Sequence, residues 1–151
     1  MNKINAVSEI TLTAIQNIPE INAGDEIASI INQCIEAQEC SLKNNDVLVI
    51  AQKIISKSED RFVDLKTVKP SEKALKISKE VDKDPRLVEL ILQESNHIVR
   101  TSKGILVVEH KLGHILANAG IDRSNVGRTD DHVLLLPENP DESAQNIKNY
   151  F

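Results

Sequence analysis

The sequence DVLVIAQKIISKSEDR, residues 46–61, joins a short apolar run to a polar, basic segment. The apolar part, Val47–Ala51, is rich in β-branched residues and does not alternate with polar ones, which is typical of a strand buried on both faces. In α/β sheets, ligands commonly bind where the chain leaves the carboxyl end of such a strand. The stretch therefore predicts an α/β fold with a candidate ligand site at residues 52–61.

Upstream of this stretch, the chain predicts a strand and a helix. Residues 4–16 alternate loosely between polar and apolar side chains, as a first strand would. A helix is expected to begin at Gly24 or Asp25, because apolar residues then recur at helical spacing along one face. These residues are Ile27, Ile30, Ile31, Cys34 and Ile35. The spacing of Cys34 and Cys40 fits neither a zinc knuckle nor a redox motif, so Cys34 is expected to be a buried free thiol.

Two helices with clear start signals follow. Ser71 is placed to cap a helix that extends to about Val81. The pair Asp84-Pro85 predicts the start of the next helix, with a capping carboxylate followed by proline at the first helical position. The side chains expected to face inward are Ala74, Leu75, Ile77 and Val81 in the first helix, and Leu87, Val88, Ile91 and Leu92 in the second.

From residue 96 the pattern changes to short strands. Residues 97–100, 105–109 and 115–119 are strand candidates separated by turn sequences at 101–104 and 111–113, as in a β-meander. Residues 133–136 form a further apolar strand candidate. Asp141 is expected to cap a closing helix, whose apolar residues are Ala144, Ile147 and Phe151. The exposed pair Tyr150-Phe151 at its end suggests either further sequence or a partner subunit.

The fold class predicted from these elements is α/β (α+β), a mixed sheet with flanking helices and a β-meander in one domain, residues 1–151. The chain is 40% hydrophobic and 27% charged, as soluble globular proteins are. Its net charge of −5 and scarcity of aromatic residues argue against nucleic-acid binding. No apolar run approaches the roughly 18 residues of a membrane span, and the N-terminus lacks a signal-peptide pattern. We expect a cytoplasmic protein with neither nucleic-acid nor membrane partners.

Two segments carry candidate chemistry. Lys53 and Lys57 are suited to neutralise phosphate oxygens, although ordinary solvated lysines are the alternative. The second segment is Asn118-Ala119-Gly120-Ile121-Asp122-Arg123-Ser124-Asn125. There Asp122 is a hard oxygen ligand suited to Mg²⁺ or Mn²⁺, and Asn125 is suited to a ligand hydroxyl or phosphate. The alternative is a turn made of residues that favour turns for local reasons.

Other chemistry-bearing residues are interpreted as structural. His110 and His114 lack the glutamate of a zinc-protease motif, and Gly113 between them favours a turn. The adjacent acids Asp130-Asp131 are expected to face water. The sequence has no P-loop, no dinucleotide-binding glycine motif and no Ser-His-Asp set, which excludes phosphate binding of the Walker type.

Taken in order, several segments resemble the coenzyme F420-0:γ-glutamyl ligases. The most specific is Asn118–Val126, and the ordered set is more telling than any single segment. The resemblance spans nearly the whole chain. Its segments are residues 17–21, 24–25, 46–50, 55–59, 70–71, 109–113, 118–126, 134–137 and 140–144.

This resemblance implies an enzyme that uses GTP to activate a carboxylate and joins L-glutamate to a deazaflavin coenzyme precursor. Family members bind divalent metal, Mg²⁺ or Mn²⁺, with K⁺ as a further candidate cation, and usually work as homodimers. By the resemblance, Asp122 is the metal ligand, and no further catalytic side chain is identified. The residues it assigns to the guanine nucleotide are Ile18, Pro19, Glu20, Ile21, Gln52, Lys53, Lys57 and Asn125.

The chain also departs from the family pattern. Family members usually have a small hydroxyl pair where this chain has Gln52-Lys53, and Leu where it has Glu20. They also continue into a segment that supplies further metal ligands, so the chain matches the N-terminal half of the family's catalytic domain. Two alternatives therefore stay open: a truncated, noncatalytic homologue that serves as a nucleotide-binding or assembly module, and a related ligase for another acid acceptor.

Overall fold

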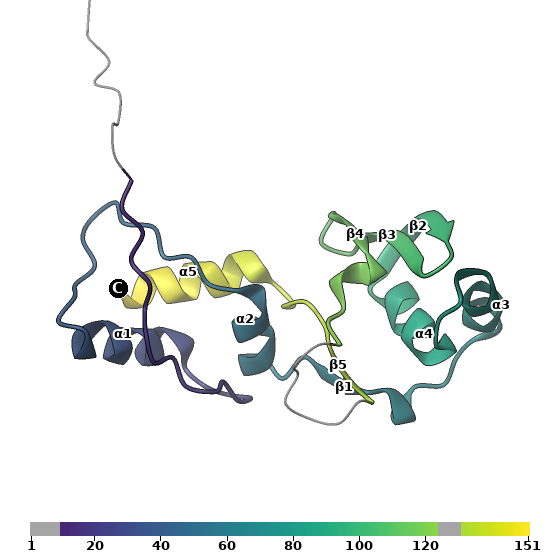
Figure 1. Cartoon of the computed structure of the whole chain (residues 1–151), viewed down its shortest axis with the longest axis horizontal. Coiled ribbons are helices and arrows are strands. Elements are labelled where there is room, and N and C mark those ends of the chain that lie inside the picture. Colours follow the sequence, from purple (N-terminus) through teal and green to yellow (C-terminus); the bar gives the residue numbers. More distant parts are fainter. Residues whose placement is uncertain (1–9, 124–130) are drawn as a thin grey trace, which may run out of the picture.

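The computed structural model describes residues 10–123 and 131–151 (Figure 1). In chain order the helices are α1 (Ile27–Ala37), α2 (Gln52–Ser58), α3 (Glu72–Val81), α4 (Pro85–Gln93) and α5 (Pro140–Tyr150). The strands are β1 (Phe62–Asp64), β2 (Ser95–Ser102), β3 (Ile105–His110), β4 (Ile115–Ala117) and β5 (His132–Leu134). Two 3-10 turns, η1 (Leu65–Thr67) and η2 (Asn118–Gly120), complete the set.

These elements form two regions on either side of the β1–β5 ribbon (Figure 1). The helical region consists of α1, α2, α5 and the extended segments 10–21 and 38–51. The meander region consists of α3, α4 and the three-stranded sheet β2-β3-β4. The predicted α+β class with a β-meander is confirmed. In the described residues the strands pair antiparallel, as two separate small sheets.

The helices of the meander region begin where their caps predict. The Ser71 hydroxyl accepts a hydrogen bond from the Ala74 amide at 3.2 Å, and the Asp84 carboxylate accepts one from the Arg86 amide at 2.8 Å. Each bond satisfies one of the amides that a helix start leaves without an intrahelical partner. Both predicted starts are therefore confirmed.

The meander region has a closed apolar core. Strand β3 lies in the middle of its sheet, with Val108 opposite Ile98 of β2 on one side and Leu116 of β4 on the other. The core unites α3, α4, η1, η2, β3 and β5. Its fully buried members are Leu65, Ala74, Val81, Val88, Ile91, Leu106, Val108, Ala119 and Val133. Leu75 was expected in this core but is exposed, because it lies on the outer face of α3.

The helical region has a smaller core made almost entirely of isoleucine. The predicted stripe of α1 is confirmed, with Ile27, Ile31 and Ile35 buried against residues of α2, of α5 and of the extended segments. Cys34 is only half-buried, with its sulfur 3.6 Å from the Asn17 carbonyl oxygen. Glu26, rather than Gly24 or Asp25, is the N-cap residue, and its side chain makes no capping hydrogen bond.

The predicted buried strand at Val47–Ala51 is wrong. The segment is extended, but no strand among the described residues pairs with it. Val47 and Val49 are 84% and 86% exposed, whereas Leu48 and Ile50 turn toward the isoleucine core. A strand is stabilised by hydrogen bonds to a neighbour, and an apolar run alone does not supply one. Residues 10–16, the described part of the predicted first strand, are likewise unpaired.

Smaller corrections concern element ends. Residues 118–119 belong to the η2 turn rather than to a strand, with positive φ at both Asn118 and Ala119. Helix α5 begins one residue before Asp141, and its cap is Asn139, whose side chain accepts a hydrogen bond from the Glu142 amide at 3.3 Å. In residues 10–123 and 131–151, no helix combines the length and apolarity needed to cross a bilayer.

Candidate functional site

The candidate site is centred on helix α2, which occupies most of the polar segment 52–61. Sequence analysis did not predict a helix there. Ile54 and Ile55 pack into the isoleucine core, and the buried Ser56 hydroxyl donates a hydrogen bond to the Gln52 side chain at 3.0 Å. With those side chains facing inward, Lys53 and Lys57 are four residues apart and share one face of the helix. The helix therefore presents two ammonium groups from adjacent turns.

Asp122, which is distant from α2 in the sequence, contacts this helix through its side chain. It follows η2, and its backbone exchanges two hydrogen bonds with Leu134 of β5, each 2.9 Å long. The turn before it is tightly packed: Gly120 has a φ of +69°, and a Cβ there would meet the Leu136 side chain at 3.0 Å. The Asn118–Gly120 sequence thus supplies both the backbone conformation and the close approach that aim Asp122 at α2.

Lys53 and Asp122 form an ion pair. The Lys53 Nζ lies 2.7 Å from the Asp122 Oδ2, and the two side chains are 33% and 20% exposed. Partial burial makes this pair less screened by solvent than most surface pairs. The structure therefore brings a predicted metal ligand and a predicted phosphate-binding cation into direct contact.

The second lysine of α2 has a different partner. The Lys57 Nζ lies 3.8 Å from the Glu20 Oε1, and the Lys57 side chain is largely buried while Glu20 is exposed. The loop that carries Glu20 is fixed to the end of α2, because the Gly24 amide donates a hydrogen bond to the Ser58 carbonyl at 2.8 Å. Both lysines are thus paired with carboxylates of their own chain.

The remaining predicted nucleotide residues are dispersed around α2. Ile21 belongs to the isoleucine core, and Ile18 is partly buried against it. Pro19 is exposed beside Glu20. Gln52 is exposed at the start of α2. Asn125 lies outside the described residues, as does Asp130.

The donor set around Asp122 fits one kind of metal site. Among the described residues, no group of three or more His, Cys, Asp or Glu side chains is arranged to hold a metal ion. Mg²⁺ in nucleotide sites, however, commonly uses one or two protein carboxylates together with phosphate oxygens and water. Asp122 already holds a cation, the Lys53 ammonium. It therefore fits a metal that is shared with a bound phosphate.

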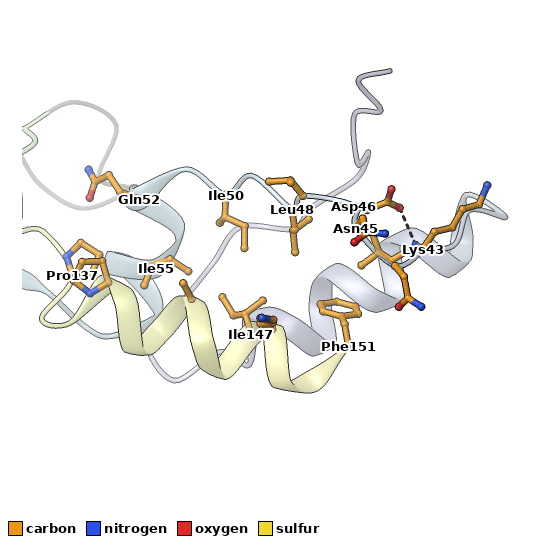
Figure 2. A pocket seen from close by; sticks show the side chains of 16 residues that line it. Lys43, Asn45, Asp46, Leu48, Ile50, Gln52, Ile55, Pro137, Ile147 and Phe151 are labelled. Carbon is orange, nitrogen blue, oxygen red and sulfur yellow. Dashed lines mark hydrogen bonds between the residues drawn. The ribbon is translucent and has the colours of Figure 1, made fainter. Parts of the chain in front are cut away.

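Two apolar grooves flank the extended segment 38–51. One, of about 680 Å³, lies between this segment and α5, and Figure 2 shows Leu48 and Ile50 across from Ile147 and Phe151. The other, of about 900 Å³, lies between the segment and α1. Neither groove is lined by Lys53, Lys57 or Asp122. Three of the predicted nucleotide residues do line the grooves: Gln52 lines the first, and Ile18 and Ile21 line the second.

A partly buried charge network that sequence analysis missed connects the two regions. The Arg61 guanidinium donates hydrogen bonds to the Leu136 carbonyl at 2.9 Å and to the Glu94 carboxylate at 3.0 Å. Glu94 also contacts Lys111 at 3.4 Å and faces the His110 Nε2 at 3.8 Å. Arg61 lies in the candidate segment 52–61, but no pattern in the sequence points to its partners, because they come from distant parts of the chain.

His110 is the most buried titratable group of that network. Its Nδ1 accepts a hydrogen bond from the Leu112 amide at 3.0 Å, and its Nε2 makes no hydrogen bond within the part of the chain that the structure describes. Burial lowers the pKa of His110; Glu94 opposes this shift, whereas Lys111, His114 and Arg61 add to it. The predicted turn between His110 and His114 is confirmed, because the Gly113 amide donates a hydrogen bond to the His110 carbonyl at 2.8 Å.

Comparison with known proteins identifies the family. The family model described as F420-0:Gamma-glutamyl ligase matches residues 16–151, which is most of the chain. The chain therefore belongs to the F420-0:γ-glutamyl ligase family, as the resemblance implied.

Three curated relatives share the name coenzyme F420:L-glutamate ligase. The protein of Methanothermobacter thermautotrophicus is 41% identical over 138 residues, which cover 91% of this chain and 54% of that protein. The protein of Methanopyrus kandleri is 36% identical over 129 residues, covering 85% and 48%. That of Methanocaldococcus jannaschii is 38% identical over 107 residues, covering 71% and 42%. This chain thus spans about half the length of the curated relatives it matches.

Proposed function

We propose that this chain is part of a GTP- and divalent-metal-dependent ligase that adds L-glutamate by an amide bond to coenzyme F420-0. The reaction class comes from the relatives, whose shared name is coenzyme F420:L-glutamate ligase. The observation that carries the proposal to these residues is the contact of 2.7 Å between Lys53 and Asp122, with Lys57 one helical turn away. A metal ligand and two cations gathered at one helix suit a bound triphosphate.

In this proposal the chemistry proceeds through an activated carboxylate. The acceptor carboxylate attacks the γ-phosphorus of GTP and GDP leaves, which gives an acyl phosphate. The glutamate amine then attacks the acyl carbon, phosphate leaves, and the amine loses a proton. A bound Mg²⁺ or Mn²⁺ supplies positive charge that polarises the phosphoryl oxygens. Asp122 would hold that metal.

The lysines of α2 contribute charge stabilisation in this scheme. Lys53 and Lys57 would each neutralise a phosphate oxygen as negative charge develops on the leaving GDP. Such a mechanism relies on positioned charges and needs no protein nucleophile. The segment of residues 18–21, in which Pro19 and Glu20 are exposed, would lie along the nucleotide. K⁺ as a second cation and a homodimeric assembly belong to the same proposal.

A second function is favoured by one specific observation. Asp122 is the one acidic side chain that contacts the lysine face of α2 at hydrogen-bonding distance among the described residues, and a two-metal site needs more ligands. A noncatalytic module that binds nucleotide without turning it over would need no more than this. A related ligase that acts on another acid acceptor is the third possibility.

One assay separates these functions. The purified chain is incubated with GTP, Mn²⁺, L-glutamate and F420-0, and the products are identified by mass spectrometry. The proposed ligase gives glutamylated coenzyme and GDP in equal amounts. A binding module retains GTP on the protein but forms neither product, and a ligase with another acceptor releases GDP only when a different acid replaces F420-0. Absence of both GTP binding and turnover would reject all three.

A further inference from the structure

The lysines of α2 form a matched pair with unequal surroundings. Lys53 contacts Asp122 at 2.7 Å, at the Oδ2 oxygen that a metal would also use, and both side chains are largely shielded from solvent. Lys57, on the next turn of the same face, is 3.8 Å from Glu20, which is exposed. Only the first lysine therefore occupies the carboxylate to which the proposed function assigns a metal.

A divalent cation and the Lys53 ammonium would repel each other if both contacted the Asp122 carboxylate. A metal bound to Asp122 would lie about 2 Å from its oxygen. It would then be within a few ångströms of an ammonium group left in its present position, and like charges at that separation repel strongly in a partly buried setting. The repulsion ends if the lysine rotates away, which its flexible stem permits.

We propose that Lys53 and the divalent metal compete for the Asp122 carboxylate, and that the displaced Lys53 ammonium then binds a phosphate oxygen of the triphosphate. This inference rests on the proposed function. Before ligand arrives, Lys53 neutralises the carboxylate. When the metal and triphosphate bind together, the metal takes the carboxylate and the ammonium moves to a phosphate oxygen, so that every charge remains paired.

The exchange makes metal binding depend on the nucleotide. Without a triphosphate, the metal must break the contact between Lys53 and Asp122 and supplies no phosphate oxygen in return, so its affinity is low. With a triphosphate, the displaced lysine gains a new partner. The two ligands therefore bind cooperatively, and the coupling passes through a single side chain.

The test is a titration of the chain with Mn²⁺, followed by electron paramagnetic resonance of the free ion. Lys53→Met removes the competing ammonium while keeping an unbranched side chain that is shorter by one heavy atom. Without nucleotide, we expect this variant to bind Mn²⁺ about threefold to tenfold more tightly than the unaltered chain. In the variant, the metal does not have to break an ion pair between residue 53 and Asp122 before it binds. Lys57→Met is the matched control and should change the affinity by less than about twofold, because its partner is Glu20.

Further arms separate the failure of this inference from the failure of the proposed function. Asp122→Asn should abolish Mn²⁺ binding in both the unaltered and the Lys53→Met backgrounds. If Mn²⁺ binding depends on Asp122 but Lys53→Met does not tighten it, the exchange is wrong while the metal site stands. If Asp122→Asn changes nothing in either background, both the exchange and the proposed metal site are wrong.

A measurement on the unaltered chain does not depend on how the variants fold. Side-chain amine resonances of lysine are followed by NMR during addition of Mg²⁺, first alone and then with a nonhydrolysable GTP analogue. The exchange predicts that the Lys53 resonance shifts when both ligands are present, and that Mg²⁺ alone, at the same concentration, shifts it much less. A Lys53 resonance that keeps its position with both ligands bound would overturn the proposal.

Discussion

The meander region and the helical region contain similar apolar residues but bury them to very different extents. In the meander region, valines such as Val88 and Val108 are fully buried between two helices and a sheet. In the helical region, Val47 and Val49 are more than 80% exposed on an extended segment with no paired strand among the described residues. Apolar side chains stabilise a fold only where neighbouring elements cover them. The meander region supplies those neighbours between Leu65 and Val133.

The largest difference between the regions is expected in amide hydrogen exchange. The amides of Val47–Ala51 make no ladder hydrogen bonds within the described structure, so they should exchange within about tenfold of unstructured rates. The amides of β3, which lies between β2 and β4, should exchange at least about 10³ times more slowly than those of Val47–Ala51. Mass spectrometry of proteolytic peptides measures both. Equal protection of the two segments would mean that residues 47–51 are paired in solution.

A matched substitution gives the next largest effect. Val88→Ala removes two methyl groups from the closed core of α4, where the side chain has no exposed surface, and should lower the free energy of unfolding by about 2 kcal/mol. Val49→Ala makes the same chemical change on an exposed side chain and should alter it by less than about 0.5 kcal/mol. Urea unfolding followed by circular dichroism compares them. A similar loss in both variants would show that Val49 is covered.

Helix capping differs between the regions as well. Helix α3 is capped by Ser71, whereas the N-cap residue of α1, Glu26, makes no side-chain capping bond. Ser71→Ala should therefore destabilise the chain by about 1 kcal/mol, and Glu26→Ser should stabilise it by about 0.5 kcal/mol. Both values come from the same urea titration. A gain from Ser71→Ala, or a loss from Glu26→Ser, would contradict the capping assignments.

A smaller effect is expected from the pH dependence of the meander region. Burial holds the pKa of His110 below its usual value of 6.5, so the unfolded chain binds protons more readily than the folded chain. The free energy of unfolding should therefore fall as pH drops below about 6.5 and stop falling below the folded pKa. His110→Asn, whose side-chain oxygen is able to accept the Leu112 amide, should flatten this slope. His97→Asn, at an exposed position, is the control. A pH dependence of the free energy of unfolding that is unchanged in His110→Asn would show that His110 is not its source.

The elements that sequence predicted best are those defined by local signals. Ser71, Asp84 and the turns between the meander strands act within a few residues, so their effects can be read directly from the chain. The predicted strand at Val47–Ala51 failed because pairing requires a partner that local sequence does not specify. Helix α2 was missed because its two core residues, Ile54 and Ile55, are too few to display a helical period.

The candidate site was predicted in part. Lys53, Lys57 and Asp122 were chosen for their chemistry, and the structure brings Lys53 and Asp122 into contact. Their pairing was not evident in advance, because it depends on the backbone hydrogen bonds between Asp122 and Leu134 and on the tight turn at Gly120. The network of Arg61, Glu94 and His110 was missed for the same reason: its members meet only through tertiary structure.

The most direct test of the account is a calorimetric titration of the chain with GTP, in the presence and absence of Mn²⁺. We predict that GTP binds at least about tenfold more tightly with Mn²⁺ than without it, and that Asp122→Asn removes this gain. Lys57→Met should weaken GTP binding more than Lys103→Met, because Lys103 lies at the β2–β3 turn, far along the chain from α2. GTP binding that is equally tight with and without Mn²⁺, and unchanged in Asp122→Asn, would contradict the claim that Asp122 and the lysines of α2 form one site.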